Sequence, residues 1–198
     1  SPGLFPDLLR PIDGTFILGA QSWKSVWFEL DPKGLVEAGE YKVEISFFVQ
    51  GGSTCNAVFD IEIIDALLPK QKLIHTNWFH TDCLATWYKV EVFSEEYWEI
   101  VENYVENAVR HGLNFILTPL FTPPLDTEVG GERPTVQLVD VYLKDGKYSF
   151  GFEKLDRWVE MCERCGVDYY EMSHLYTQWG AKHAPKIMAS ENGEYKRI

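Results

Sequence analysis

The sequence has few cysteines and no long apolar run, and both absences restrict what the protein can be. Four cysteines in 198 residues do not make the dense disulfide framework of a small secreted domain. Cys162 and Cys165 have CxxC spacing, but they lie in a helical pattern and no second pair completes a zinc site. No apolar run approaches the roughly 18 residues that cross a bilayer. With no recognisable signal peptide, the sequence constrains localisation little and favours the cytoplasm.

Basic residues are also scarce relative to acidic ones. Lys and Arg number 18 against 30 Asp and Glu, which gives a formal net charge of −12. Phosphate backbones and anionic membrane surfaces are repelled by such a chain, so we expect neither nucleic acid nor membrane as a partner. A neutral ligand is easier to accommodate.

Apolar and aromatic residues are abundant, at 45% and 15% of the chain, which is enough for a real core. Residues 1–70 show strand patterns at 25–32, 40–50 and 56–65, separated by Gly- and Pro-containing turns. Three strands are too few to bury two faces alone. We therefore interpret residues 1–70 as a partial β-sandwich-like module.

From Leu73 onward, strand and helix patterns alternate. Strands are predicted at the start of Leu73–Trp87, at Leu113–Leu117 and at Val167–Met172, and the helices between them begin at Ser94 and Phe152. A hairpin with an Asp145-Gly146 turn is predicted from 136 to 152. Successive crossovers indicate parallel strands with helices outside them.

The predicted fold class is α/β, with residues 71–198 forming the first three strands of a (β/α)₈ barrel. A complete barrel needs about 250 residues, and this segment has about half that length. We therefore expect a fragment of a larger protein. Its open sheet edge should be covered by a second chain or by the missing C-terminal part, because unpaired edge groups invite association.

Each predicted strand is followed by a loop that is rich in Trp, His or Pro. Loops at the carboxyl ends of parallel strands meet at one edge and commonly form the active site of a barrel. We expect the candidate substrate-binding residues to gather there: Trp78, His80, Asp82, Thr118, His174, Gln178 and Trp179.

The chemistry of these side chains suits sugar recognition. Trp78 and Trp179 offer flat faces for the C–H side of a pyranose, while imidazole, carboxylate and amide groups hydrogen-bond to hydroxyls. Structural roles remain open: wedging for the two Trp, and bracing of one short loop for His80 and Asp82. Thr118 should form the floor. We expect no metal and no cofactor, since no HxxxH or HExxH spacing occurs.

Four segments carry a resemblance to a known family: LIHTNWFHTDCLATWY, SEEYWEIVENYVENAVRHGLN, ILTPLFTPPLDT and YYEMSHLYTQWGAKHAPKI. They are similar to the glycoside hydrolase family 123 catalytic domain and to the related DUF4091 proteins. The resemblance covers about Leu73–Lys186, and more loosely the region before it, because that family places a β-sandwich ahead of its barrel.

The resemblance implies an exo-acting β-N-acetylgalactosaminidase with substrate-assisted retaining catalysis. In that family an adjacent Asp-Glu pair orients the 2-acetamido group and supplies the general acid/base. This chain has no Asp-Glu dipeptide, so no catalytic residue is assigned, and the fragment alone is expected to be inactive. A non-catalytic carbohydrate-binding module and a structural or interaction protein are the alternatives.

Overall fold

The computed structural model describes residues 10–32, 34–122, 127–129, 131–176 and 180–198. The chain divides into two compact units, Ser1–Pro69 and Lys70–Ile198.

The first unit is built on one long antiparallel hairpin. Strands β1 (Gly39–Phe48) and β2 (Thr54–Ile63) pair along their whole lengths, from Gly39 opposite Ile63 to Phe48 opposite Thr54. The second and third predicted strands are thus confirmed. The first is wrong, because residues 25–32 form no strand. The aromatic and β-branched residues that suggested it stay largely exposed, with Trp27 at 74%, and the segment has no ladder partner among the described residues, although the Phe28 ring meets Phe47 of β1 edge to face.

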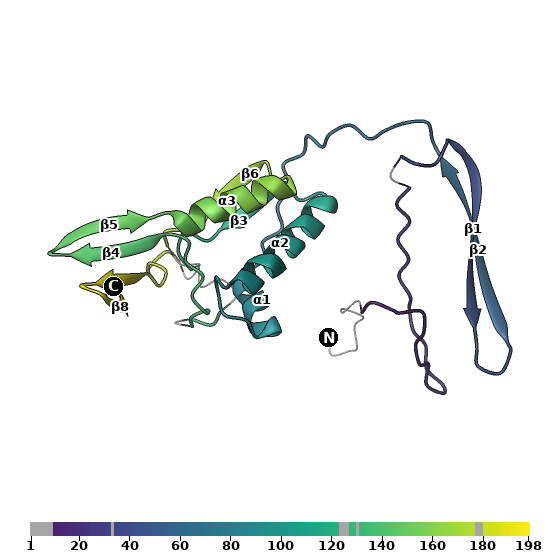
Figure 1. Cartoon of the computed structure of the whole chain (residues 1–198), viewed down its shortest axis with the longest axis horizontal. Helices are drawn as coiled ribbons and strands as arrows, with labels where there is room; N and C mark the ends of the chain where they lie inside the picture. Colours follow the sequence, from purple (N-terminus) through teal and green to yellow (C-terminus); the bar gives the residue numbers. More distant parts are fainter. Residues whose placement is uncertain (1–9, 33, 123–126, 130, 177–179) are drawn as a thin grey trace. The chain divides into compact units, whose positions relative to one another are not determined.

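The second unit is a mixed α/β structure of three helices and two small sheets in its described residues (Figure 1). The helices are α1 (Thr81–Tyr88), α2 (Glu95–Arg110) and α3 (Glu153–Cys165). Ser94 caps α2 by accepting a hydrogen bond from the Tyr97 N–H, and Gly166 ends α3 in the left-handed conformation. The N-cap positions of α2 and α3, Ser94 and Phe152, confirm the predicted helix starts. None of these helices is long and apolar enough to cross a bilayer.

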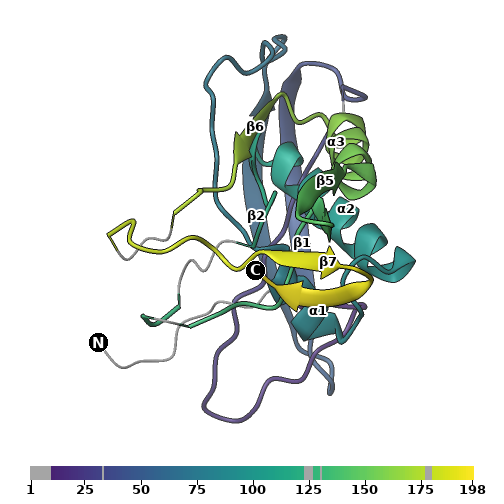
Figure 2. The same cartoon turned by 90° about the vertical axis from the view of Figure 1, so that its left-hand side faces the viewer.

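A two-stranded parallel sheet lies at the centre of this unit. Strand β3 (Phe115–Thr118) pairs with β6 (Tyr169–Met172), with Phe115 opposite Tyr169 and Thr118 opposite Met172. Helices α2 and α3 cover one face of the pair (Figure 1, Figure 2). The β3–α3–β6 crossover confirms two of the predicted parallel strands and the helix that joins them.

The first predicted parallel strand, which begins at Leu73, is wrong as a strand but correct in its position. His75 O accepts from the backbone N–H groups of both Asn114 and Phe115. The Asn114 side chain accepts from His75 N and donates to Leu73 O. Two backbone N–H groups of the β3 side thus share the His75 carbonyl. The Asn114 side chain, not a strand backbone, makes the hydrogen bonds to His75 N and Leu73 O. The segment therefore lies beside β3 without a regular ladder.

The second sheet has four strands in the order β5-β4-β7-β8. Strands β4 (Asp140–Lys144) and β5 (Lys147–Gly151) form the predicted hairpin, and Asp145 and Gly146 both have positive φ in its turn. Strands β7 (Met188–Glu191) and β8 (Glu194–Arg197) add a second hairpin. No strands were predicted in this region, although Asn192-Gly193 is a hairpin-turn signal.

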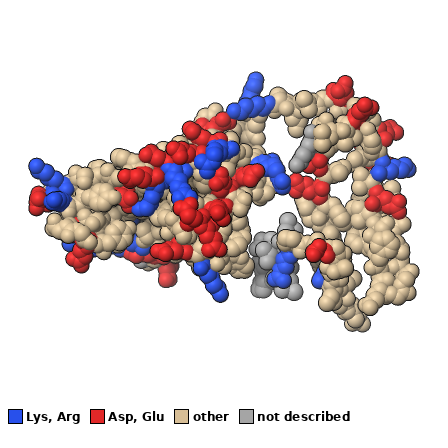
Figure 3. Space-filling view, viewed as in Figure 1, with Lys and Arg blue, Asp and Glu red and all other residues tan. Residues whose placement is uncertain are grey.

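The core of the second unit lies between the helices and the β3–β6 pair. Its largest fully buried side chains include Trp158 and Tyr97, and Ile116 contributes from β3. On the outer side, acidic and basic residues are interspersed over α2 and α3 (Figure 3). Arg157 pairs with Glu95, and Arg164 with Glu102, across the two helices. Exposed pairs of this kind add little stability, so packing of the apolar stripes holds the helices together.

Candidate functional site

The loops that follow β3 and β6 begin side by side. Ser173 N donates to Thr118 O at 3.0 Å, and Ser173 Oγ accepts from Phe121 N at 3.3 Å. The parallel pairing thus places both carboxyl ends at one edge, and these two hydrogen bonds tie the loop starts together. Ligand sites of open parallel sheets lie at this kind of edge.

An aromatic and acidic cluster lies at this edge and consists of Trp78, Glu171 and His174. Trp78 Nε1 donates to Glu171 Oε2 at 2.7 Å. The rings of Trp78 and His174 meet edge to face, with centroids 5.3 Å apart and planes at 72°. Trp78 remains 47% exposed, so its indole is held from two sides while much of its surface stays accessible.

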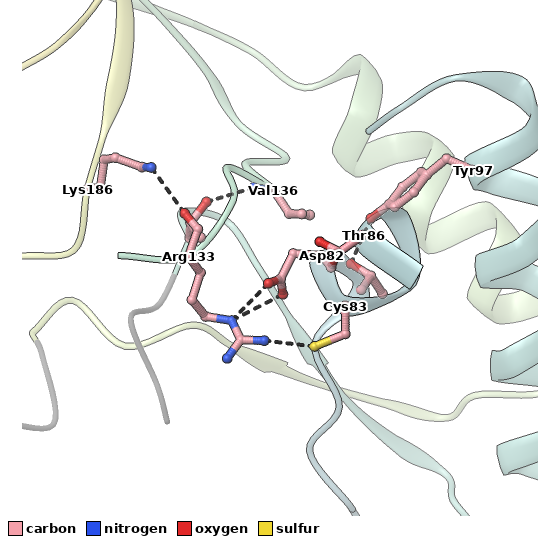
Figure 4. A network of polar contacts seen from close by, with 9 residues as sticks. Asp82, Cys83, Thr86, Tyr97, Arg133, Val136 and Lys186 are labelled. Carbon is pink, nitrogen blue, oxygen red and sulfur yellow. Dashed lines mark hydrogen bonds and ion pairs between the residues drawn. The ribbon is translucent and has the colours of Figure 1, made fainter. Parts of the chain in front are cut away.

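A second cluster surrounds the buried ion pair of Asp82 and Arg133 (Figure 4). Arg133 Nε lies 3.2 Å and 3.1 Å from the two Asp82 oxygens, and its Nη2 donates to Cys83 Sγ at 2.9 Å. The Arg133 and Asp82 side chains are only 12% and 8% exposed. Lys186 Nζ donates to Arg133 O at 3.1 Å. The network links the start of α1 to the loop that follows β3.

Burial and pairing act in opposite directions on the guanidinium. Desolvation disfavours the charged form of Arg133, but the hydrogen bond to Asp82 and the attraction of its carboxylate, together with the contact to Cys83, outweigh it, so the pKa of Arg133 is raised. The guanidinium therefore stays charged in this buried position. With both oxygens facing one guanidinium N–H, Asp82 fixes the start of α1 against the Arg133 loop.

The interpretation of Asp82 as a loop residue is wrong, because Asp82 lies in the first turn of α1. His80 is the N-cap residue, although its side chain makes no cap hydrogen bond. An acid in the first turn is favoured by the exposed N–H groups there. Arg133 was missed altogether. It stands alone in a Gly- and Pro-containing loop, and no spacing in the sequence connects it to Asp82.

A small cavity of about 20 Å³ lies beside this ion pair. Its walls include His80, Thr122, Arg133 and Trp158. The Trp158 indole N–H is buried and has no hydrogen-bond partner among the described residues. A space of this size holds about one water molecule when polar groups line it, so it is too small for a sugar ring.

The hydroxyl of Tyr97 connects α2 to the start of α1, because it donates to Thr81 Oγ1 at 2.7 Å. Burial is the main reason that the pKa of Tyr97 rises from 10.0 to about 12. The unfolded chain loses this proton near pH 10, whereas the folded chain keeps it. The stabilisation is complete below pH 10 and is lost as the pH rises towards 12.

We therefore predict that Tyr97→Phe flattens the alkaline decline of stability. The free energy of unfolding of the wild type should fall between pH 10 and 12, with Tyr97 contributing up to about 1.4 kcal/mol per pH unit. Urea unfolding at several pH values, for wild type and variant, checks this. Tyr170, whose pKa is also raised to about 12, titrates in both proteins, so the difference between the two profiles reports Tyr97. Parallel profiles would contradict the prediction.

Thr118 is fully buried, its hydroxyl lies 3.4 Å from Ile116 O, and it does not line the cavity. Gln178 and Trp179 lie outside the described residues, so the proposed clustering of all candidates stays a prediction. Glu171 was not among the substrate-binding candidates, and its hydrogen bond with Trp78 places it in the cluster. Within the described ranges, no three His, Cys, Asp or Glu side chains gather as a metal site would require.

A parallel β–α–β unit with an aromatic and acidic cluster at its carboxyl edge is typical of α/β enzymes that act on small polar molecules. The family model described as glycoside hydrolase 123, catalytic domain, matches residues 78–198. The chain therefore belongs to the glycoside hydrolase 123 catalytic domain family, as the resemblance implied, and its expected substrate is a carbohydrate. No curated protein matches the chain.

Proposed function

We propose that this chain forms part of the substrate-binding wall of a β-N-acetylgalactosaminidase. Family membership over residues 78–198 carries the proposal, because it covers both edge loops and all of the candidate side chains. The Trp78–Glu171–His174 cluster supports it with an accessible indole face, a carboxylate and an imidazole within one group of contacts. These are the groups with which a protein recognises a neutral sugar.

The proposed reaction is substrate-assisted hydrolysis with retention at C1. The carbonyl oxygen of the 2-acetamido group attacks C1 while a Glu carboxyl group protonates the departing glycosidic oxygen. Water then attacks C1 and returns its proton to the same carboxylate, which restores the acetamido group. An Asp next to that Glu orients the acetamido group. The 198 residues contain no Asp-Glu dipeptide, so we assign the pair to polypeptide outside them.

The same proposal includes the architecture. Strands β3 and β6 would be neighbouring strands of a (β/α)₈ barrel, and the segment from Leu73, which lies beside β3, would take the place of the strand before them. The first unit would be part of a β-sandwich-like module. The parallel β3–β6 register and the helices on one face support this. The exposed edge of β6 would be covered by further barrel strands or by a second chain.

The test is hydrolysis of a pair of matched substrates by the full-length protein. An aryl β-N-acetylgalactosaminide supplies the acetamido nucleophile, whereas the aryl β-galactoside has only a 2-hydroxyl. We expect kcat/KM to be larger by at least about 100-fold for the acetamido substrate, since an intramolecular nucleophile is lost from the other. Equal rates on the two substrates would refute substrate assistance. Sugar binding without any turnover would favour a non-catalytic carbohydrate-binding module.

A further inference from the structure

Glu171 lies on the face of the parallel pair that the helices do not cover. In the β3–β6 register Leu117 pairs with Glu171, and Ile116 pairs with Tyr170. Ile116 belongs to the helix-side core and Tyr170 packs against it. Because successive side chains of a strand alternate between faces, Glu171 projects from the opposite face, one residue before β6 ends at Met172.

Trp78 reaches Glu171 across the carboxyl end of β3. Trp78 follows the segment whose His75 O accepts from the N–H groups at the start of β3, and β6 pairs with the other edge of that strand. The 2.7 Å hydrogen bond from Trp78 Nε1 to Glu171 Oε2 therefore spans the strand between them. The edge contact with His174 fixes the same indole from the loop after β6.

The second oxygen of Glu171 is the unused group of this cluster. No hydrogen bond or ion pair to Glu171 Oε1 occurs among the residues that the structure describes, and Glu171 has no Lys or Arg partner there. A carboxylate accepts through both oxygens. With Oε2 held by Trp78, Oε1 is the oxygen of this carboxylate that can accept a hydrogen bond from a bound molecule.

We propose that Glu171 is a positioning and specificity residue that accepts a hydrogen bond from a hydroxyl of the sugar ring lying against Trp78. The inference rests on the proposed function and assigns a role within that site. Trp78 would meet the apolar C–H face of the pyranoside, and Glu171 Oε1 would take one hydroxyl at the rim. The two contacts together fix which face and which edge of the sugar approach the acid pair. One charge-assisted hydrogen bond of this kind discriminates strongly against a ring that lacks the hydroxyl.

Glu171→Gln and Glu171→Ala separate the two roles of the carboxylate. The Gln carbonyl oxygen can still accept from Trp78 Nε1, but the free oxygen becomes an NH₂ donor. For the full-length protein acting on an aryl β-N-acetylgalactosaminide, we expect kcat/KM to fall about 10- to 100-fold in Glu171→Gln. It should fall further in Glu171→Ala, which also releases the indole. Glu160→Gln, on the exposed side of α3, is the matched control and should leave kcat/KM unchanged.

Deoxygenated substrates distinguish recognition from a merely structural role. Among the 3-, 4- and 6-deoxy forms of the substrate, one should have a lower kcat/KM than the parent substrate with the wild type. Glu171→Gln should not lower kcat/KM further on that form, because the hydroxyl that Glu171 would bind is already missing. If Glu171→Gln lowered kcat/KM by the same factor on all of these substrates, the inference would be overturned. It would also be overturned if the wild type were active and Glu171→Gln had the same kcat/KM as the wild type.

A second readout does not need turnover. The Trp78 indole N–H resonance should shift on titration with free N-acetylgalactosamine, and the shift should require a higher sugar concentration in Glu171→Gln. A wild type without turnover but with this pattern refutes the proposed reaction and supports the role of Glu171. A Trp78 resonance that does not respond to the sugar overturns that role.

Discussion

Arg133→Met should destabilise the second unit by about 3–5 kcal/mol, because removing one partner of a buried pair leaves the other charge without compensation. Asp82 would keep its 8% exposure but would lose the guanidinium that faces both of its oxygens. The hydrogen bond from Arg133 to Cys83, near the start of α1, would be lost as well. Urea unfolding of wild type and variant at pH 7 measures the difference.

The matched control is Arg164→Met on the surface of α3. Arg164 also pairs with a carboxylate, that of Glu102, but its side chain is 59% exposed. Exposed pairs contribute about 0–1 kcal/mol, so this variant should unfold close to the wild type. Burial rather than pairing itself makes the difference. If both variants lost the same free energy, the Asp82–Arg133 pair would have no special structural role.

Trp158→Ala should cost about 3–5 kcal/mol of unfolding free energy. Trp158 is the largest fully buried side chain and is 1% exposed in the core between α3, α2 and β3. Its removal would also enlarge the small cavity beside Asp82. Thermal and urea unfolding both report the loss. Trp87→Ala is the matched control, since Trp87 is 71% exposed near the end of α1, and its change should stay within about 0.5 kcal/mol.

Trp158→Phe refines this result. Phe keeps most of the ring volume and removes the indole N–H, for which the described part of the chain supplies no hydrogen-bond partner. An unpaired buried donor costs free energy in the native state, so Trp158→Phe should be much less damaging than Trp158→Ala. A loss as large as that of Trp158→Ala would show that the N–H is satisfied inside the cavity, for example by water.

Local signals in the sequence determined several elements correctly. Helices α2 and α3 are specified by signals close to them in the sequence. These signals are the Ser94 cap, the helical spacing of apolar residues and Gly166 at the end of α3. The Asp145-Gly146 turn specifies the β4–β5 hairpin in the same way. Interactions between near neighbours dominate these features. The family resemblance, carried by short edge-loop motifs, is confirmed by the match over residues 78–198.

Local signals failed where pairing depends on distant residues. The β7–β8 hairpin was not predicted, because its sequence is polar and includes Glu191, Glu194 and Lys196. Parallel pairing of β7 with β4, as in Tyr142 opposite Ser190, ties it to a strand far earlier in the chain. Leu73 and its neighbours resemble a strand in composition, yet the Asn114 side chain occupies their hydrogen-bonding positions.

The sequence by itself determined helices α2 and α3, one hairpin, the parallel β–α–β order and the family, and it located chemistry-bearing loops after the strands, but it did not predict α1. Only the tertiary structure decided which side chains meet. Trp78 and Glu171 are 93 residues apart, and Asp82 and Arg133 are 51 residues apart. Helical and strand periodicities specify the face on which a residue lies but not its partner on another element. Partner choice follows from strand register and packing of the whole unit, which turned Asp82 into half of a buried ion pair and brought Glu171 to Trp78.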